Sequence, residues 1–485
     1  MTRDVPELSN EQALPTLIQG GMGVAVSNWR LARAVASEGQ LGVVSGVAIG
    51  TVLARRLQDG DAGGEMRAGL ARFPDPEIAR KILERYFRPE GRAGRPYLAT
   101  PVPAVRPSLE FQRLAAAGAF VEVTLAREGH SGPVGINFLE KLQLSNLPAM
   151  YGALLAGVDF VLVGAGIPRD VPAALDQLAL HRGARLRVAL EVDEAGGEPP
   201  ETVFDPAACF PALAALPLMR PRFLAIVSSV ALAEYLLKHA TGRIDGFVIE
   251  GPTAGGHNAP PRGALRLSER GEPIYGPRDA VDFSAFSRLG LPFWLAGGWG
   301  SPERLREARA LGATGVQVGT AFAVCDESGL APHLRRALVE HWGRSVAAEP
   351  VFTDPLASPT HFPFKVVPLA GTLADPAVYA ARERICDLGF LRATCRRADG
   401  SVLYRCPAEP VDDFVAKGGA PLDTQGRKCL CNALVADIGL AQVRSDGYVE
   451  PPIVTAGDGL RDLPHLLASR PSLHAADLVH ALVGT

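Results

Sequence analysis

The sequence predicts an α/β fold, a (β/α)8 TIM barrel with insertions, followed by a C-terminal cysteine-containing cap or extension. Short apolar runs alternate with helical stretches from about residue 16 to residue 320. The runs are almost continuously apolar, as expected of parallel strands buried on both faces, and eight of them would close a barrel. An open doubly wound sheet is the rival, but no Gly-x-Gly-x-x-Gly lies between a strand and a helix to support its dinucleotide-binding form. The eight predicted strands are Thr16–Gln19, Leu41–Val44, Val134–Phe138, Asp159–Val163, Phe223–Ser228, Gly246–Glu250, Phe293–Ala296 and Gly315–Val318.

Helix signals occupy several of the intervening segments. Ser301 followed by Pro302 predicts a helix start, with a capping hydroxyl and a proline at the first helical position. Gly312 predicts the end of that helix. Ser27 and Gly39 are expected to bracket another helix.

The predicted barrel domain spans residues 1–325, with insertions at about 52–130 and 168–222. The first insertion should contain a helix at Pro76–Phe87 and the second an extra strand at Leu186–Val192. Residues 326–485 are proline-rich and hold five of the seven cysteines. This part is expected to be a folded extension or cap, because its segments 362–369 and 431–443 are too hydrophobic to remain solvated.

Composition narrows the class of protein. The chain is 47% hydrophobic, enough for a sizeable core, and its formal charge of −3 gives no electrostatic case for nucleic acid. The first residues lack the apolar region of a signal peptide, and no run of about 18 apolar residues predicts a membrane span. An odd number of cysteines, seven, argues against a disulfide framework. A cytoplasmic setting is expected.

The segment from Glu250 to His257, Glu-Gly-Pro-Thr-Ala-Gly-Gly-His, directly follows a predicted strand. Its paired glycines let the backbone approach a flat ligand, and His257 would lie at the edge of that ligand. A tight turn with a surface histidine is the alternative. The other histidines, such as His130, His181 and His361, have no comparable context and are expected to be surface or structural residues.

Two further strand ends are typical of a phosphate site. Strand seven ends in Gly297 and Gly298, and strand eight ends in Gly319 and Thr320. Barrels often bind phosphate with these two loops, through backbone N–H groups near a helix N-terminus. The glycines would otherwise only turn the chain.

The first and third strands add a flat surface and an amide. A glycine run, Gly20-Gly21-Met22-Gly23, ends strand one, and Asn137 lies in strand three. A side-chain amide both donates and accepts hydrogen bonds, as ring heteroatoms require. Together these ends could surround a phosphate-bearing planar cofactor, a description that flavin mononucleotide (FMN) fits.

These motifs, taken together, resemble the nitronate monooxygenase (2-nitropropane dioxygenase) family, which shares them with FMN-dependent enoyl-acyl-carrier-protein reductases. The resemblance covers roughly residues 14–325 and implies a TIM barrel with one non-covalent FMN. The motifs that carry it, in chain order, are Ile18-Gln-Gly-Gly-Met-Gly23, Leu41-Gly-Val-Val-Ser-Gly46, Gly135-Ile-Asn137, Ala254-Gly-Gly-His257, Ala296-Gly-Gly298 and Gly315-Val-Gln-Val-Gly-Thr320.

The resemblance implies the cofactor contacts residue by residue. The strand-one turn would lie against the flavin ring, and the segment from Gln317 to Thr320 would hold its phosphate end. Glu250 stands where nitronate monooxygenases usually have glutamine and enoyl reductases often have glutamate, which keeps the subfamily open. The implied cofactor-binding residues are Gly21, Met22, Gly23, Asn137, Glu250, Gly255, Gly256, Gly297, Gly298, Gln317, Gly319 and Thr320.

Three functions follow from the resemblance. The first is oxidation of nitronates or nitroalkanes with O₂ to a carbonyl compound and nitrite. The second is NAD(P)H-dependent reduction of an enoyl thioester, with an acyl-carrier partner. The third is a flavin-binding partner protein of a biosynthetic complex. His257 is the predicted catalytic residue, with an ordinary pKa near 6.5 suited to proton transfer or to orienting an anion. A small-molecule substrate is expected, and a homo-oligomer is left open.

The C-terminal cysteines allow a metal site. Four thiolates could bind zinc or an iron–sulfur cluster, and the preferred ligands are Cys386, Cys406, Cys429 and Cys431. No Cys-x-x-Cys is present, so reduced packing residues are the alternative. In the same extension Lys365 would either meet a phosphate or anionic substrate, or lie in solvent.

Overall fold

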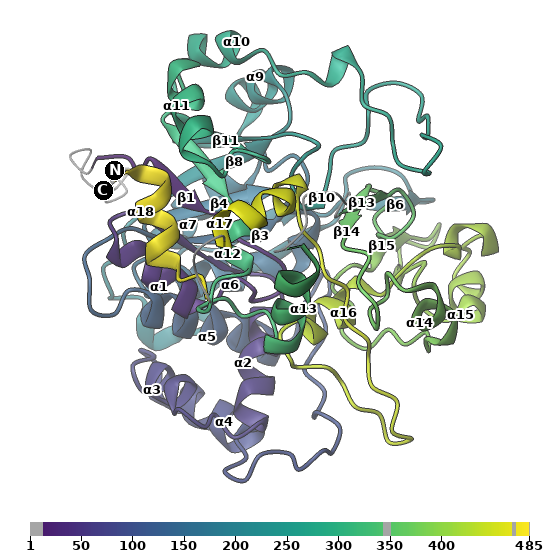
Figure 1. Cartoon of the computed structure of the whole chain (residues 1–485). Helices are drawn as coiled ribbons and strands as arrows, with labels where there is room; N and C mark the ends of the chain where they lie inside the picture. The colour runs from purple at the N-terminus through teal and green to yellow at the C-terminus, as the bar shows by residue number, and fades with distance from the viewer. Residues whose placement is uncertain (1–12, 343–350, 468–471, 485) are drawn as a thin grey trace.

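A computed structural model describes residues 13–342, 351–467 and 472–484. Its centre is a closed barrel of eight parallel strands, which confirms the predicted fold class (Figure 1). Every predicted barrel strand is present, and no end differs by more than one residue. In spatial order the strands are β1 (Leu17–Gln19), β2 (Leu41–Ser45), β3 (Val134–Leu139), β4 (Phe160–Gly164), β8 (Arg222–Val227), β9 (Gly246–Glu250), β11 (Phe293–Ala296) and β12 (Gly315–Val318).

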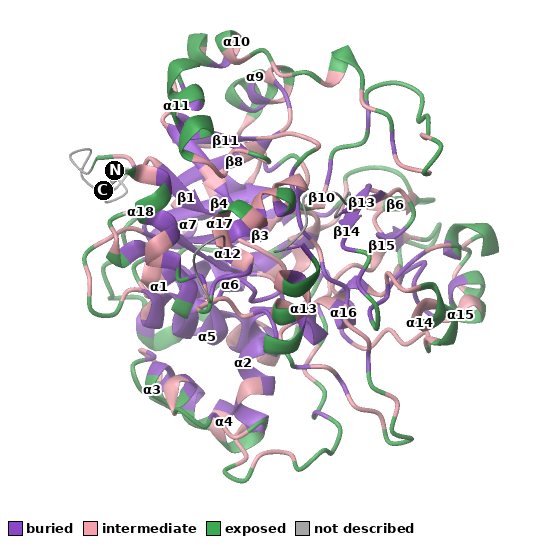
Figure 2. Ribbon diagram, viewed as in Figure 1, coloured by how far each residue is buried: buried purple, intermediate pink, exposed green. Residues whose placement is uncertain are grey.

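The barrel interior is packed with side chains and is not a pore. Alternate residues of the strands point inward, so Ile18, Val248 and Trp294 belong to an interior cluster while their chain neighbours face the outer helices. Trp294 is fully buried, and its indole Nε1 donates to the carbonyl of Pro15 at 2.8 Å. This hydrogen bond satisfies the one polar atom of a large core side chain. The buried residues of the central strands are visible in Figure 2.

Helices cover the outside of the barrel, and their ends follow capping rules. Ser301 caps its helix through a bond from the Arg304 N–H, Pro302 is the first helical residue, and Gly312 follows the end at φ +87°. Helix α1 lies between Ser27 and Gly39 as predicted, and its N-cap is Asn28, whose side chain accepts from the Leu31 N–H. The Ser27 hydroxyl is used inside the strand-one turn instead. The helices α1 (Trp29–Ser37), α6 (Gln143–Leu155), α7 (Val171–Ala179), α9 (Val230–His239), α10 (Phe283–Arg288), α11 (Pro302–Ala310) and α12 (Thr320–Ala323) connect or follow barrel strands.

Four helices lie between β2 and β3, in the region predicted as the first insertion. They are α2 (Ile49–Gln58), α3 (Glu65–Ala71), α4 (Pro76–Tyr86) and α5 (Leu109–Ala126). The predicted helix at Pro76–Phe87 is therefore present. Helix α5 is mostly buried and packs on α1, α2 and α6, so it belongs to the outer layer of the barrel. Helices α3 and α4 lie at the bottom of Figure 1, away from the barrel strands.

The predicted extra strand in the second insertion is divided in two. Strand β5 (Ala184–Arg187) pairs with β7 (Glu201–Phe204), whereas β6 (Leu190–Asp193) pairs with a strand of the C-terminal part. A single strand at Leu186–Val192 is wrong, because the chain leaves one sheet and joins another at residues 188–189. A short helix, α8 (Pro206–Cys209), follows.

The C-terminal part is folded and is joined to the barrel loops by two small sheets. Its strand β14 (Phe364–Val366) pairs with β13 (Phe352–Asp354) and with β10 (Gly256–His257) of the barrel. Its strand β15 (Ala393–Arg396) pairs with β16 (Val402–Arg405) and with β6. The helices of this part are α13 (Pro332–Trp342), α14 (Pro376–Ala381), α15 (Val411–Ala416), α16 (Leu430–Ala436), α17 (Leu463–Leu467) and α18 (Ala475–Val483).

The last helix returns to the barrel. Helix α18 packs against α1 and α11, and His480 Nε2 lies 2.7 Å from Glu38 Oε2. Figure 1 shows α18 on the opposite side of the molecule from α14 and α15. Within the described residues no helix has both the length and the apolar character needed to cross a lipid bilayer.

Candidate active site

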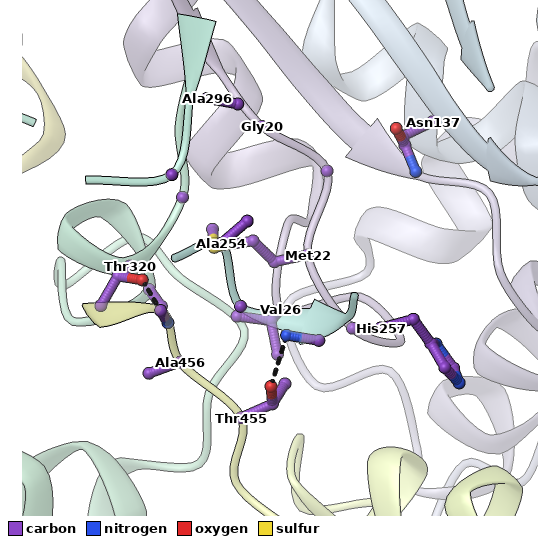
Figure 3. Close-up of a pocket in the computed structure, with 18 of the residues that line it drawn as sticks. Gly20, Met22, Val26, Asn137, Ala254, His257, Ala296, Thr320, Thr455 and Ala456 are labelled. Carbon is purple, nitrogen blue, oxygen red and sulfur yellow. Dashed lines mark hydrogen bonds between the residues drawn. The ribbon is translucent and has the colours of Figure 1, made fainter. Parts of the chain in front are cut away.

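A cavity of about 240 Å³ lies at the carboxyl ends of the barrel strands. The loops after β1, β3, β9, β11 and β12 form one side of it, and the C-terminal part forms the other. All twelve residues predicted to bind the cofactor line this cavity, and so does His257. Figure 3 shows residues of both sides facing the same space, among them Met22 and Asn137 from the barrel and Thr455 from the C-terminal part.

The strand-one turn is held by a buried hydrogen-bond network. Gln19 is fully buried; its Nε2 donates to Gly20 O at 2.6 Å and to Ser27 Oγ at 2.9 Å. The Ser27 hydroxyl donates back to Gly20 O and accepts from the Met22 N–H. A Cβ at Gly21 would stand 2.3 Å from the Asn137 Cβ, so glycine is required there by the side chain on β3. The turn is therefore pre-organised.

The loop after β11 depends on glycine for a different reason. Gly297 and Gly298 have φ values of +83° and +75°, in the left-handed region that other residues rarely adopt. A Cβ at Gly297 would stand 2.8 Å from the Ala254 N, and Thr253 Oγ1 donates to Gly297 O at 3.0 Å. The loops after β9 and β11 are thus in direct contact.

The end of β12 presents polar atoms toward the cavity. Gln317 Oε1 is buried and has no hydrogen-bond partner among the described residues. Thr320 Oγ1 accepts from the Gly457 N–H at 2.9 Å, which leaves its own O–H available to donate. No lysine or arginine is among the described residues that line the cavity. A bound phosphate would therefore be held by N–H and O–H groups.

Glu250 is the last residue of β9 and lines the cavity. Burial raises the pKa of its carboxyl group to about 7. A carboxyl group with this pKa is part neutral and part ionised near neutral pH, so it can either donate or accept a hydrogen bond.

His257 is bonded to the C-terminal part. Its Nε2 lies 2.7 Å from Ser358 Oγ, and its ring meets Phe364 edge to face at 4.9 Å between centroids. Burial, assisted by the nearby Lys141 cation, lowers the pKa of His257 to about 3. The expectation of an ordinary pKa near 6.5 is therefore wrong. The imidazole is neutral at neutral pH.

The sequence missed the contribution of the segment around residue 456. The Gly256 N–H donates to Thr455 Oγ1 at 2.8 Å, and the Asp458 N–H donates to Thr253 O at 2.9 Å (Figure 3 shows the first bond). The partners are about 200 residues apart in the chain, and no local signal in the sequence relates them. The apolar character of residues 362–369 and 431–443 indicated only that this part is folded.

Lys365 takes neither of its predicted positions. Its side chain is buried, and its Nζ pairs with Asp458 Oδ1 at 2.6 Å. It is absent from the described lining of the cavity, so it does not meet a ligand there. Its role is to hold the C-terminal segment, because the Lys365 carbonyl also accepts from Thr455 Oγ1.

The predicted cysteine ligands do not form a metal site in the described structure. Among the described residues no group of three or more His, Cys, Asp or Glu side chains is arranged to hold a metal ion. The thiols of Cys386 and Cys406 share a hydrogen bond. Cys429 Sγ donates to Ile385 O, and Cys431 lines the cavity. Zinc and iron–sulfur binding are thus not supported.

The remaining predicted histidines make local contacts. His130 Nε2 lies 2.7 Å from Ala126 O, and His181 Nδ1 lies 2.8 Å from the Tyr151 hydroxyl. His361 Nδ1 accepts from Arg427 at 2.6 Å. None of the three is among the described residues that line the cavity.

A closed parallel barrel with a largely apolar cavity at the carboxyl ends of its strands has the architecture of a barrel enzyme. Residues 219–347 match the family model described as nitronate monooxygenase. This match confirms the relation to the nitronate monooxygenase family that the motifs predicted.

Two nitronate monooxygenases are similar to this chain over segments of little more than 110 residues. A probable nitronate monooxygenase of Bacillus subtilis is 35% identical over 115 residues, which are 24% of this chain and 31% of that protein. The nitronate monooxygenase of Pseudomonas aeruginosa is 38% identical over 113 residues, 23% of this chain and 30% of that protein. The matched segments thus span about a third of each relative. FabK from Thermotoga maritima aligns with a TM-score of 0.45 and 14% identity, covering 97% of this chain and 92% of its own.

Proposed function

We propose that this chain is an FMN-dependent oxidoreductase that oxidises nitronates or nitroalkanes with O₂ to a carbonyl compound and nitrite. One observation supports the proposal above others: twelve residues from separate strand ends, predicted as cofactor contacts, line one cavity. The cavity also suits a planar group with a phosphate. The unpartnered Gln317 Oε1 can accept from a ring N–H, while Thr320 can donate to an anion.

Each part of the site has a distinct task in this proposal. The strand-one turn and Asn137 would lie along the ring, and the loops after β11 and β12 would hold the phosphate. Bound FMN would supply electron transfer from the substrate. His257 would orient the anionic nitronate or move the proton of a neutral nitroalkane, and the apolar wall of the C-terminal part would exclude water.

An enoyl-thioester reductase is the second candidate, and two observations favour it. Glu250 is the residue that such reductases often have at this position. The C-terminal part also lines the cavity with large apolar side chains, among them Phe364, Phe390, Leu430 and Leu434, which suit an acyl chain. NAD(P)H and an acyl-carrier partner would then be required. A flavin-binding partner protein without catalysis is the third candidate.

The purified protein is expected to be yellow and to release FMN on heating. It should turn over a nitronate with consumption of O₂ and formation of nitrite. Assays with NADPH and an enoyl thioester, run on the same preparation, test the second candidate. Bound FMN without turnover in either assay supports the partner protein, and a colourless protein that FMN cannot reconstitute contradicts all three.

Gly298→Val is expected to weaken FMN binding at least tenfold. The left-handed φ of Gly298 makes valine unfavourable by roughly 1–3 kcal/mol, and the side chain would enter the predicted phosphate loop. Gly290→Val is the matched control, because Gly290 has the same φ of +75° with nothing within 4 Å of an added Cβ. Both variants should lower Tm, and FMN titration followed by fluorescence should separate them. Equal FMN affinity in the two variants would contradict the phosphate assignment.

A further inference from the structure

A chain of hydrogen bonds connects His257 to Lys141, which lies in a short 3-10 helix, Glu140–Leu142, directly after β3. His257 Nε2 lies 2.7 Å from Ser358 Oγ, which lies 2.9 Å from Thr360 Oγ1. Lys141 Nζ donates to the same Thr360 Oγ1 at 3.2 Å. Ser358 is fully buried, and the other members are partly buried. The barrel supplies the two ends of the chain, and the C-terminal part supplies its two hydroxyl groups.

The directions of these bonds are fixed by the donors and acceptors available. A lysine ammonium only donates, so Thr360 accepts from Lys141 and donates to Ser358. The Ser358 oxygen also accepts the Thr360 N–H at 3.2 Å, which fills both of its lone pairs. Its own proton must then be donated to His257 Nε2. With Lys141 charged, the neutral ring therefore carries its proton on Nδ1, the nitrogen that Ser358 does not contact.

We propose that Lys141, Thr360, Ser358 and His257 form a proton relay, in which His257 exchanges a proton with the substrate and Lys141 is the group that finally holds it. The inference rests on the proposed function, in which a proton must leave a neutral nitroalkane. It assigns Lys141, Thr360 and Ser358 as positioning and relay residues that act through His257.

The proton balance of the relay is complete. When Lys141 is a neutral amine, the hydroxyl donors point the other way, so His257 carries its proton on Nε2 and its Nδ1 is free. From this state the substrate C–H bond breaks and its proton joins His257 Nδ1. The Nε2 proton passes to Ser358, the Ser358 proton to Thr360, and the Thr360 proton to the neutral amine of Lys141. The product state has an ammonium at Lys141 and a neutral imidazole, with the donor order seen in the structure. His257 is never required to remain charged.

The pKa shifts of His257 and Lys141 are consistent with transfer of the proton through His257 to Lys141. A neutral His257 with a depressed pKa is a poor base alone, and an acceptor further along the chain removes that difficulty. Burial lowers the pKa of Lys141 to about 7, against the opposing effect of the adjacent Glu140 carboxylate, so a substantial fraction is neutral near pH 7. Lys141 also lies 2.8 Å from the Phe362 ring centroid. Two further titratable or charged groups lie nearby: His361, whose pKa is lowered by burial and by Arg427, and Arg427 itself, which donates to Ser358 O.

Variants of the FMN-loaded protein test the relay through its pH profile. With a neutral nitroalkane, the wild-type rate should rise with pH through about 7 as Lys141 loses its proton. Lys141→Met should lower the rate by about 10²-fold and abolish the rise. Thr360→Val should cause the same loss with Lys141 in place. Both variants should remain near the wild-type rate on preformed nitronate, which needs no proton removal.

Two controls separate the relay from other effects. Lys141→Arg keeps the charge but does not release a proton in this range, so it should also lack the rise. Lys238→Met, at an exposed position on α9, should leave the profile unchanged. A rise that persists in Lys141→Met would belong to Glu250 and would overturn the relay. An unchanged nitroalkane rate in Thr360→Val would overturn the proposed path.

A readout without turnover distinguishes failure of the relay from failure of the proposed function. In nitrogen-labelled histidine spectra, His257 should be neutral, with its proton on Nδ1 below about pH 7 and on Nε2 once Lys141 has lost its proton. Lys141→Met should raise the pKa of His257 by removing a nearby cation, whereas Thr360→Val should not. Absence of turnover in the wild type, with these spectra as expected, would reject the nitroalkane chemistry alone. A proton that stays on the same ring nitrogen of wild-type His257 as the pH passes through about 7 would reject the relay.

Discussion

His257→Ala is expected to retain FMN and to lose about 10²–10⁴-fold in kcat on a neutral nitroalkane. The side chain lines the cavity and is held by Ser358 and Phe364, so its removal deletes a positioned imidazole without disturbing the strand-one turn or the loops after β11 and β12. Steady-state nitrite formation, with FMN content measured on the same sample, tests this. Wild-type rates in the variant would exclude a catalytic role.

Comparison of two substrates distinguishes proton transfer by His257 from orientation of the anion by His257. If His257 only moves the proton, preformed nitronate should be oxidised by His257→Ala much better than the neutral nitroalkane. Equal loss on both substrates would instead mean that the imidazole orients the anion. No pH step near 6.5 should be assigned to His257, because its pKa is depressed to about 3 and it is neutral throughout that range. His239→Ala, at an exposed position on α9, is the matched control.

Truncation after residue 325 is expected to give insoluble protein or protein without FMN. The deleted part covers the cavity with buried apolar residues such as Phe364 and Leu430, and it supplies Ser358, the hydrogen-bond partner of His257. Exposure of such a surface in the remaining barrel favours aggregation. Expression, solubility and FMN content of the truncated chain test this, and a soluble, fully active truncation would contradict it.

A point substitution examines the same contact without removing the segment. A Cβ at Gly457 would stand 2.7 Å from Thr253 O and 2.9 Å from Gly255 N, so Gly457→Val must move the segment away from the loop after β9. We expect a loss of about 1–3 kcal/mol in the free energy of unfolding and a weaker affinity for FMN. Gly459→Ala is the control, because its added methyl group meets only Asp462 Oδ2, at 3.9 Å. Identical FMN affinity in both variants would show that this contact does not support the site.

The barrel was predictable from sequence because its signals are local. A parallel strand that is buried on both faces has a short, almost continuously apolar sequence. The glycines that follow such strands indicate the edge of the barrel where a ligand would bind. The sequence alone could therefore assign the Gly21 turn and the loop at Gly297 to this edge of the barrel. The sequence bracketed α1 by Ser27 and Gly39 without giving its cap, since Ser27 and Asn28 are both good N-caps; in the structure Asn28 is the cap, and the Ser27 hydroxyl accepts from Gln19.

What could not be predicted depends on contacts between distant segments. The environment of His257 is set by Ser358 and Lys141, neither of which has a local signal of function. Lys365 is buried by its pairing with Asp458, 93 residues further along the chain. The break in the extra strand at residues 188–189 depends on pairing with β15, about 200 residues away. Such contacts leave no trace in spacing or composition.

The bond between Gly256 and Thr455, which are 199 residues apart, also sets an order of events during synthesis. At about 5–20 residues per second, Thr455 leaves the ribosome roughly 10–40 s after Gly256. During that interval β11 and β12 complete the set of barrel strands and Ser358 becomes available to His257, but the segment around residue 455 is still missing from the wall of the cavity. A chain interrupted at any point in this interval would therefore lack a complete site. Under the proposed function, an unfinished chain would have no complete site in which to react with O₂.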